Sequence, residues 1–145
     1  MQAQQSFEIY TDGSLKEGRG SWAYVILQNG EVVKEAFGKS RKTTCNRMEF
    51  QAAIEAFKVL PVKSKVQMFT DSRNLIDTVT IWMSEWKQYD WVKKNQRPIP
   101  AVDLVKQLDF WNSEHEISWK WVRAHAGNEW NERCDQLCIA ARTGP

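Results

Sequence analysis

The chain has few cysteines, no long apolar run and almost no excess of charge. Its 145 residues include three cysteines, an odd number that argues against a disulfide framework and favours a reducing compartment, which we expect to be the cytoplasm. No apolar stretch approaches the roughly 20 residues of a membrane-spanning helix, so we expect no membrane partner. The first residues, Met1 to Ser6, are polar and uncharged and do not resemble a secretory signal.

The formal net charge is only +2, so binding to a polyanion has to depend on local basic patches. A hydrophobic content of 42% with 26% charged residues is typical of a folded globular protein. We see no repeat, low-complexity tract or linker, and we expect one domain over residues 1–145. Eight tryptophans are the exception in this composition; most should be buried, and a few exposed ones could pack on a ligand.

Alternating and periodic apolar residues predict three strands, a helix, and then two further strands separated by helices. This order indicates an α/β fold with a five-stranded mixed sheet: an antiparallel meander with a hairpin at Asn29-Gly30, then two strands reached by helical crossovers, with helices on the faces. A turn is expected at Gly18-Arg19-Gly20. The strands are expected at 7–12, 22–27, 31–37, 66–70 and 116–122. The helices are expected from Thr43 or Thr44 to about 60, and at 72–80, 102–111 and 130–141.

Two segments of the chain read almost alike, Ile9 to Ser14 and Met68 to Arg73. Each is an apolar run that stops at Thr-Asp and turns at once into small or polar residues. An acid at the end of a buried strand is unfavourable unless a cation compensates its charge. If the two strand ends lie side by side, Asp12 and Asp71 form a carboxylate cluster that needs a divalent metal.

Two further acids are expected on the inner faces of helices. Glu49 shares a helical stripe with three alanines near a helix start, and Asp135 follows Asn131 by one turn between Cys134 and Cys138. Taken alone, each acid is most simply a turn, cap, surface or ion-pair residue; Asp135, for example, could pair with a neighbouring arginine. Taken together, the four acids predict a site for Mg²⁺ or Mn²⁺.

The motifs around these acids resemble type 1 ribonuclease H, the bacterial-type enzyme. They are Thr11-Asp12-Gly13-Ser14, Thr44-Cys45-Asn46-Arg47-Met48-Glu49, Thr70-Asp71-Ser72, His125-Ala126-Gly127 and Asn131-Glu132-Arg133-Cys134-Asp135, in the family's order over nearly the whole chain. The resemblance implies a ribonuclease-H-like fold and a monomeric endonuclease. Such an enzyme hydrolyses the RNA strand of RNA–DNA hybrids by a two-metal-ion mechanism, leaving 5′-phosphate and 3′-hydroxyl ends.

The resemblance also implies roles for single residues. Asp12, Glu49, Asp71 and Asp135 would be catalytic metal ligands for two Mg²⁺ ions with substrate bound, with Mn²⁺ as a substitute. His125, in a loop made flexible by Gly127, would carry a proton or assist product release. Glu49 and the backbone around Gly13, Ser14 and Cys45 would contact the 2′-hydroxyl of the RNA strand. Asn46 would lie in the minor groove. Lys42 and Thr44 would bind a phosphate of the DNA strand, and Trp82 would form a wall of the DNA channel.

The chain departs from the family pattern at several positions. The loop after Asp12 is short, Cys45 and Ala101 stand where asparagines are usual, and Asn74 replaces an aromatic residue. A basic segment follows Trp82, but acidic residues dilute it; its members are Lys87, Lys93, Lys94 and Arg97, with Glu85 and Asp90 among them. We expect the chemistry to be intact and hybrid binding to be weaker or altered, with no separate hybrid-binding domain. Trp86 and Trp91 are expected in the core.

Four alternatives use the same residues. A 3′–5′ exonuclease usually has a second acid two residues after the first strand-end Asp, where this chain has Ser14, and an integrase lacks the His-Ala-Gly loop. A hybrid-binding module without activity would gain from replacing its repelling acids. A zinc site of Cys134, Cys138 and His125 is disfavoured because the cysteines follow an apolar stripe and no fourth ligand is evident.

Overall fold

The computed structural model describes residues 4–144, so Met1 to Ala3 of the polar amino-terminal stretch lie outside the described residues. Five strands form one sheet in the order β3-β2-β1-β4-β5. The first three strands pair antiparallel, whereas β4 pairs in parallel with both β1 and β5, which confirms the predicted mixed sheet. The strands are β1 (Ser6–Lys16), β2 (Arg19–Gln28), β3 (Glu31–Ser40), β4 (Lys65–Thr70) and β5 (Glu116–Trp121).

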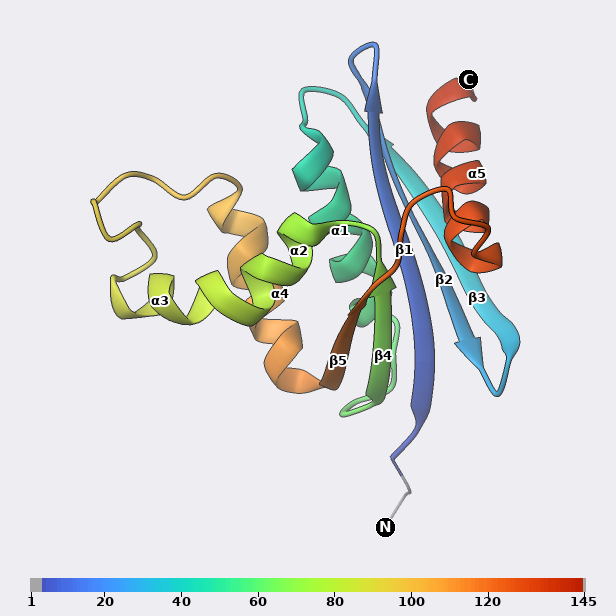
Figure 1. Ribbon diagram of the computed structural model, residues 1–145, viewed down its shortest axis with the longest axis horizontal. Coiled ribbons are helices and arrows are strands. Elements are labelled where there is room, and N and C mark those ends of the chain that lie inside the picture. The colour runs from blue at the N-terminus through green and yellow to red at the C-terminus, as the bar shows by residue number, and fades with distance from the viewer. Residues whose placement is uncertain (1–3, 145) are drawn as a thin grey trace.

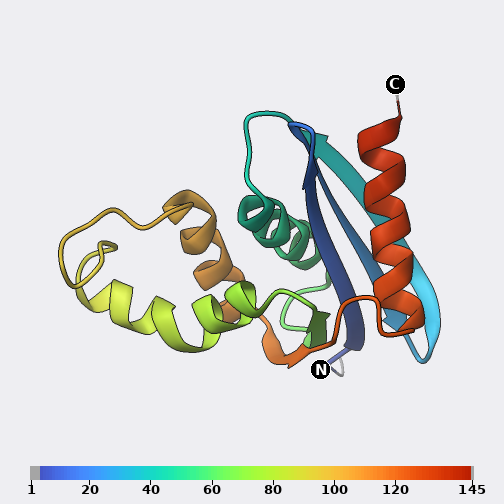
Figure 2. The ribbon, with the colours of Figure 1, turned by 45° about the horizontal axis from the view of Figure 1, so that its top comes forward.

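Helices cover both faces of the sheet (Figure 1). One face carries α1 and α4, the other carries α5, and the segment from α2 to α3 projects away from the sheet (Figure 2). The helices are α1 (Cys45–Lys58), α2 (Arg73–Asp77), the π-helical segment η1 (Thr78–Trp82), α3 (Met83–Gln88), α4 (Val102–Glu114) and α5 (Glu129–Thr143). Within residues 4–144, no helix has the length and apolar character that crossing a bilayer requires.

Two hydrophobic clusters lie on opposite faces of the sheet. The larger one includes Ile9, Phe57 and Met68 and lies under α1 and α4. The smaller one packs Cys134 and Cys138 of α5 against apolar residues of β1 and β2. Because side chains alternate along β1, its even-numbered residues point toward α5 and its odd-numbered residues toward α1. This alternation places Asp12 on the face that α5 covers.

Side-chain caps fix the starts of two helices, α1 and α2, close to the predicted acids. The Thr44 hydroxyl accepts the Arg47 N–H at 3.1 Å and begins α1, and the Ser72 hydroxyl accepts the Leu75 N–H at 3.1 Å and begins α2. Both helix starts agree with the sequence prediction. Helix α1 ends just before the Val59 cap and Pro61, as a proline that follows a helix favours.

The structure differs from the prediction in several places. Strand β1 continues to Lys16, so Asp12 lies within the strand and not at its end as predicted. The turn lies at Glu17-Gly18, so that Arg19 and Gly20 already pair in β2. The helix expected at 72–80 continues through η1 and α3 to Gln88. It does so because Val79, Met83 and Trp86 extend its apolar stripe and pack on the larger cluster.

Candidate active site

Parallel pairing of β1 and β4 brings the two Thr-Asp segments side by side. The register runs from Ser6 opposite Lys65 to Tyr10 opposite Phe69, and its continuation places Asp12 beside Asp71. Asp12 is buried in the middle of β1, whereas Asp71 follows the last residue of β4 and is half-buried. The similarity of the two segments therefore corresponds to neighbouring positions in the sheet.

Glu49 reaches the same place because α1 approaches β1 unusually closely. A Cβ atom added at Gly13 would lie 2.3 Å from the backbone nitrogen of Glu49 and 2.5 Å from the Met48 carbonyl carbon. Only glycine permits this approach, because both neighbours are backbone atoms that cannot move aside alone. Glu49 is 6% exposed, and its Oε2 atom is buried without a hydrogen-bond partner.

Asp12, Glu49 and Asp71 form one compact group, in which one carboxylate oxygen from each residue lies within 4.8 Å of the other two. Burial, followed by repulsion from Asp71 and Asp135, raises the pKa of Asp12 to about 7. Burial, followed by repulsion from Asp12 and Asp71, raises the pKa of Glu49 well above its ordinary value. Such a cluster of partly buried acids is stabilised in its ionised form only by added positive charge.

Several neighbours hold Asp71 in position. The Asn131 side-chain amide donates to Asp71 Oδ2 at 3.4 Å, and the Trp121 indole N–H donates to the Asp71 carbonyl at 3.2 Å. Arg73 in turn stacks 4.2 Å above the Trp121 ring. Burial raises the Asp71 pKa most, while Asn131 and then His125 act to lower it.

Asp135 and His125 lie at the border of the three-acid group. Asp135 is half-buried on α5 and outside the 4.8 Å group, yet its charge raises the pKa of Asp12. Arg133, a possible partner for Asp135, pairs instead with Glu35, at 2.6 Å between Nη2 and Oε1. His125 is exposed in the loop before α5 and has a left-handed φ of 54°, and Gly127 follows with a φ of 83°.

A groove of about 770 Å³ runs from the start of α1 toward the projecting segment of α2 and α3. Thr44, Asn46 and Trp82 line it, together with Asn74 and Ala101, two of the positions where the chain departs from the family pattern. The Trp82 side chain is 44% exposed, whereas Trp86 and Trp91 pack partly buried against the larger core cluster, as predicted. The groove thus joins the candidate minor-groove residue to the candidate aromatic wall.

The remaining predicted substrate residues lie outside the lining of this groove. Lys42 is exposed with a left-handed φ of 52°, and Ser14 is half-buried at the end of β1. The Cys45 thiol lies 3.9 Å from the Gly13 carbonyl oxygen, so both residues are adjacent to the acids. Thr44 uses its hydroxyl as the cap of α1, which orients it at the mouth of the groove.

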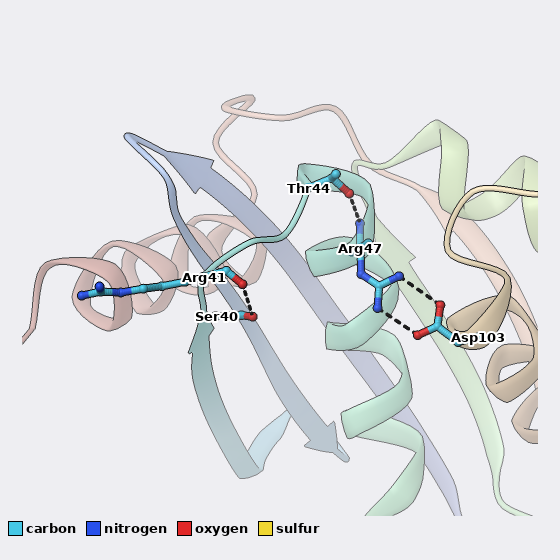
Figure 3. A network of polar contacts seen from close by, with 5 residues as sticks. All are labelled: Ser40, Arg41, Thr44, Arg47 and Asp103. Carbon is cyan, nitrogen blue, oxygen red and sulfur yellow. Dashed lines mark hydrogen bonds and ion pairs between the residues drawn. The ribbon is translucent and has the colours of Figure 1, made fainter.

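Sequence reasoning missed residues that shape the site without carrying its charge. Arg47 forms a two-pronged ion pair with Asp103, at 3.0 and 2.9 Å, which joins α1 to α4 beside the groove (Figure 3). Asn131 was noticed only as a marker of helical spacing, although its position one turn before Asp135 indicates that it faces the same acids. The Trp121 contact to Asp71 joins residues 50 positions apart and has no local signal.

The buried cysteines serve packing. Cys134 Sγ lies 3.3 Å from the Tyr10 carbonyl oxygen, and Cys138 Sγ lies 3.6 Å from the Asp12 carbonyl oxygen. Burial raises the pKa of both thiols. Among the described residues, the acids Asp12, Glu49 and Asp71 form the group suited to a metal, and no cysteine belongs to it.

Comparisons with known proteins agree with this geometry. The family model described as RNase H matches residues 4–143. A ribonuclease H from Rickettsia bellii is 42% identical over 136 residues, which cover 92% of this chain and 87% of that protein. The solved structure of LC9-RNase H1, described as a type 1 RNase H with the type 2 active-site motif, has a TM-score of 0.85 and 28% identity over 97% of this chain and 74% of that one.

A second solved structure shows the same fold with a bound nucleic acid. LC11-RNase H1 in complex with an RNA/DNA hybrid has a TM-score of 0.70 and 20% identity, and the match covers 94% of this chain and 96% of that one. The family model spans the acids at positions 12, 49, 71 and 135, and the fold places three of them within 4.8 Å of one another. The chain belongs to the RNase H family.

Proposed function

We propose that this ribonuclease H hydrolyses the RNA strand of RNA–DNA hybrids with two Mg²⁺ ions held by Asp12, Glu49, Asp71 and Asp135. The observation that carries the proposal is the group of three carboxylates within 4.8 Å, drawn from β1, α1 and the end of β4. Mn²⁺, which also prefers oxygen ligands, would substitute. The products would be 5′-phosphate and 3′-hydroxyl ends.

The residues present fit divalent metal ions. The Glu49 Oε2 atom is buried without a hydrogen-bond partner, and hard cations take carboxylate oxygens of this kind as ligands. Burial and mutual repulsion raise the pKa values of Asp12 and Glu49, so bound cations would also relieve an unfavourable cluster of charge. When bound, such ions polarise the phosphoryl group and activate water in line with the bond that breaks.

The chain's own residues would supply position and proton movement. Asn131, through its bond to Asp71 Oδ2, fixes the carboxylate that ends β4, and Gly13 allows Glu49 to lie against β1. His125 is exposed beside Asp71 in a loop that contains Gly127, so it can approach and leave the reacting phosphate. A histidine so placed would accept or deliver a proton during hydrolysis.

Substrate recognition would follow the surface next to the acids. Glu49 and the backbone near Gly13, Ser14 and Cys45 would contact the 2′-hydroxyl that distinguishes RNA from DNA. Asn46 would enter the minor groove, and Trp82, exposed on the 770 Å³ groove, would pack on the DNA strand. Lys42 and Thr44, at the turn before α1, would hold a phosphate of that strand.

We further propose that residues 1–145 act as one catalytic domain, as a monomer in the cytoplasm. One continuous sheet with helices on both faces supports a single unit within the described residues. Three free cysteines, one of them exposed, support a reducing compartment.

The test is a cleavage assay with labelled RNA–DNA hybrid, double-stranded RNA and double-stranded DNA in Mg²⁺. We expect cutting of the RNA in the hybrid alone, and loss of cutting in EDTA or in Asp71→Asn. Glu31→Gln, at the exposed start of β3 away from the acids and the groove, is the matched control and should cut normally. Equal cutting of all three duplexes, or activity that survives EDTA, would contradict the proposal.

A further inference from the structure

A second pocket lies away from the groove, at the end of the sheet where α5 terminates. It has a volume of about 640 Å³, and its lining comes from the start of β2, the end of β3 and the last residues of α5. Both ribbon views place the β1–β2 hairpin and the carboxyl end of α5 at the same end of the molecule (Figures 1 and 2). The pocket is lined by Arg19, Gly20, Lys39, Ser40, Arg41, Arg142, Thr143 and Gly144.

The lining is strongly basic. Four of these residues are cationic, and none of the described residues that line the pocket is acidic. Arg41 extends away from Arg47 and toward α5, on the opposite side from the ion pair with Asp103 (Figure 3). The helix dipole explains one cation at the carboxyl end of a helix, but that effect acts within the last turn. It does not account for Arg19 on β2, Lys39 on β3 and Arg41 directly after β3.

One of the arginines has an unmet hydrogen-bonding group. The Arg142 Nη1 atom is buried and has no hydrogen-bond partner, while the Arg142 carbonyl accepts from Arg19 Nη1 at 3.4 Å. A buried charged donor without a partner is unfavourable. An anion in this pocket would satisfy it. A guanidinium group matches the oxygens of a phosphate in two-pronged geometry, so phosphate is the anion that suits this set best.

The pocket adjoins the acidic site on the α5 face of the sheet. Arg142 follows Asp135 by seven residues, which places both on one stripe of α5 about 10 Å apart along the helix. On β2, Gly20 precedes Ala23, the partner of Asp12, by three residues, also about 10 Å in a strand. The Arg142 charge lowers the pKa of Asp12, which agrees with this proximity.

We propose that the cluster of Arg19, Lys39, Arg41 and Arg142 binds a backbone phosphate of the RNA strand of the hybrid, beyond the bond that is cut. The inference rests on the proposed function, since it assumes that RNA is cut at Asp12, Glu49 and Asp71. A separation of about 10 Å along the duplex axis would correspond to about three nucleotides, at an advance of 3.4 Å per nucleotide of one strand. The proposed function places the DNA strand in the groove with Trp82, on the other side of the start of α1. The pocket beside α5 is therefore available to the RNA strand.

The test compares the parent protein with the double variant Arg41→Gln/Arg142→Gln. Binding of a hybrid is measured by fluorescence anisotropy in EDTA, where no cutting occurs, over a range of salt concentrations. We expect the Kd to rise about tenfold at 0.1 M salt, and the magnitude of the slope of log K against log salt to fall by about 1, because one phosphate contact contributes about 0.9. In Mg²⁺, the KM should rise while kcat stays within about twofold.

Two kinds of variant control for charge and folding. Lys34→Gln/Lys65→Gln removes the same charge from exposed positions elsewhere on the sheet and should leave Kd nearly unchanged. Arg142→Lys keeps the charge and the stem but loses the two-pronged geometry, so it should bind hybrid more tightly than Arg142→Gln and more weakly than the parent. Thermal unfolding of every variant shows whether it is folded.

Neutral methylphosphonates identify the strand and the position. Replacing RNA-strand phosphates about three nucleotides from the cut should raise the Kd of the parent protein about as much as the two arginine substitutions do. The same replacement should not raise the Kd of the double variant further. The same replacement in the DNA strand should affect both proteins equally. If replacement in the DNA strand instead abolishes the difference in Kd between the parent and the double variant, the assignment of the pocket to the RNA strand is wrong.

Two results would overturn the proposal outright. One is an unchanged Kd and salt slope in Arg41→Gln/Arg142→Gln. The other is an NMR titration in which inorganic phosphate shifts the Arg142 side-chain signal while the double variant binds hybrid normally, which would make the pocket a site for free phosphate. A parent protein that binds hybrid through this pocket but does not cut it would contradict the proposed function alone.

Discussion

At the scale of single residues, burial of Asp12 and Glu49 determines how the site behaves without metal. Asp12 is 7% exposed and Glu49 6%; burial raises the pKa of both carboxyl groups, and the charge of Asp12 raises the pKa of Glu49 further. Because the pKa of Asp12 is raised from 3.8 to about 7, the folded state binds a proton that the unfolded state releases between these pH values. This contribution to stability is full below about pH 4 and is lost as the pH rises through about 7.

Asp12→Asn should therefore stabilise the metal-free protein at pH 8 but not at pH 4. A shift of about three pH units corresponds to at most about 4 kcal/mol, so we expect a gain of about 2–4 kcal/mol in the free energy of unfolding at pH 8. Urea unfolding in EDTA at both pH values measures it. The exposed Asp90→Asn should change neither value, and an equal gain for Asp12→Asn at pH 4 would show that repulsion and burial of charge are not the cause.

His125 differs from the acids because it is exposed, and its proposed role requires that it approach and leave the reacting phosphate. We expect His125→Ala to lower kcat about a hundredfold, the usual contribution of a positioned proton carrier. His125→Asn, which tolerates the left-handed φ of 54°, should be equally slow. Mg²⁺ affinity, measured by calorimetry, should stay within about twofold of the parent in both variants; a loss of affinity would make His125 a metal ligand.

At the scale of elements, the start of α5 positions two residues of the site. The Asn128 side chain accepts the N–H groups of Trp130 at 3.1 Å and Asn131 at 2.9 Å, which begins the helix. Asn131 then reaches Asp71, and Asp135 follows one turn later. The cap therefore supports the geometry of the acids as well as the helix.

Asn128→Ala should lower the free energy of unfolding by about 1 kcal/mol, the usual loss for a removed cap. It should also reduce kcat, because the first turn of α5 carries Asn131. Asn128→Ser keeps an acceptor and should recover most of both quantities. Chemical denaturation and steady-state kinetics measure the two effects, and a serine variant as impaired as alanine would argue that the side chain has another function.

Elements also differ in how well the sequence predicted them. Strands β1, β2 and β4 followed from alternating or continuous apolar residues, and the start of α1 followed from a cap expected at Thr43 or Thr44. The extension of the second helix to Gln88 was missed, because its apolar residues Val79, Met83 and Trp86 follow the core surface through the π-helical turn of η1. Packing, rather than local spacing, continues that helix.

At the scale of the whole molecule, a metal at the acidic group would join β1, α1 and the end of β4. Binding to the folded state alone raises stability with metal concentration. We expect Mg²⁺ at 100 times its Kd to add about 2.7 kcal/mol at pH 8, or about 5–10 °C in Tm at 2–4 °C per kcal/mol. At pH 5 the effect should shrink, since protons then compete for Asp12 and Glu49, whose pKa values are raised.

Thermal unfolding with and without Mg²⁺ measures this effect. The double variant Asp12→Asn/Asp71→Asn lacks two of the three clustered carboxylates and should lose the Mg²⁺-dependent rise in Tm. Lys34→Gln/Lys65→Gln should keep it. A rise of equal size in the acid variant would place the bound metal elsewhere on the molecule.

By itself, the sequence predicted the class of fold and the order of strands and helices along the chain, and it singled out four acids, three of which the structure brings together. It could do so because strand periodicity, helix caps and the repeated Thr-Asp motif are local patterns that physical chemistry ties to local structure. The tertiary structure alone decided which groups lie within reach: the 4.8 Å group without Asp135, the contact of Trp121 with Asp71, and the basic pocket formed by two strands and the end of α5. These features join residues far apart in the chain, and only the packing of the sheet between its helices fixes their distances.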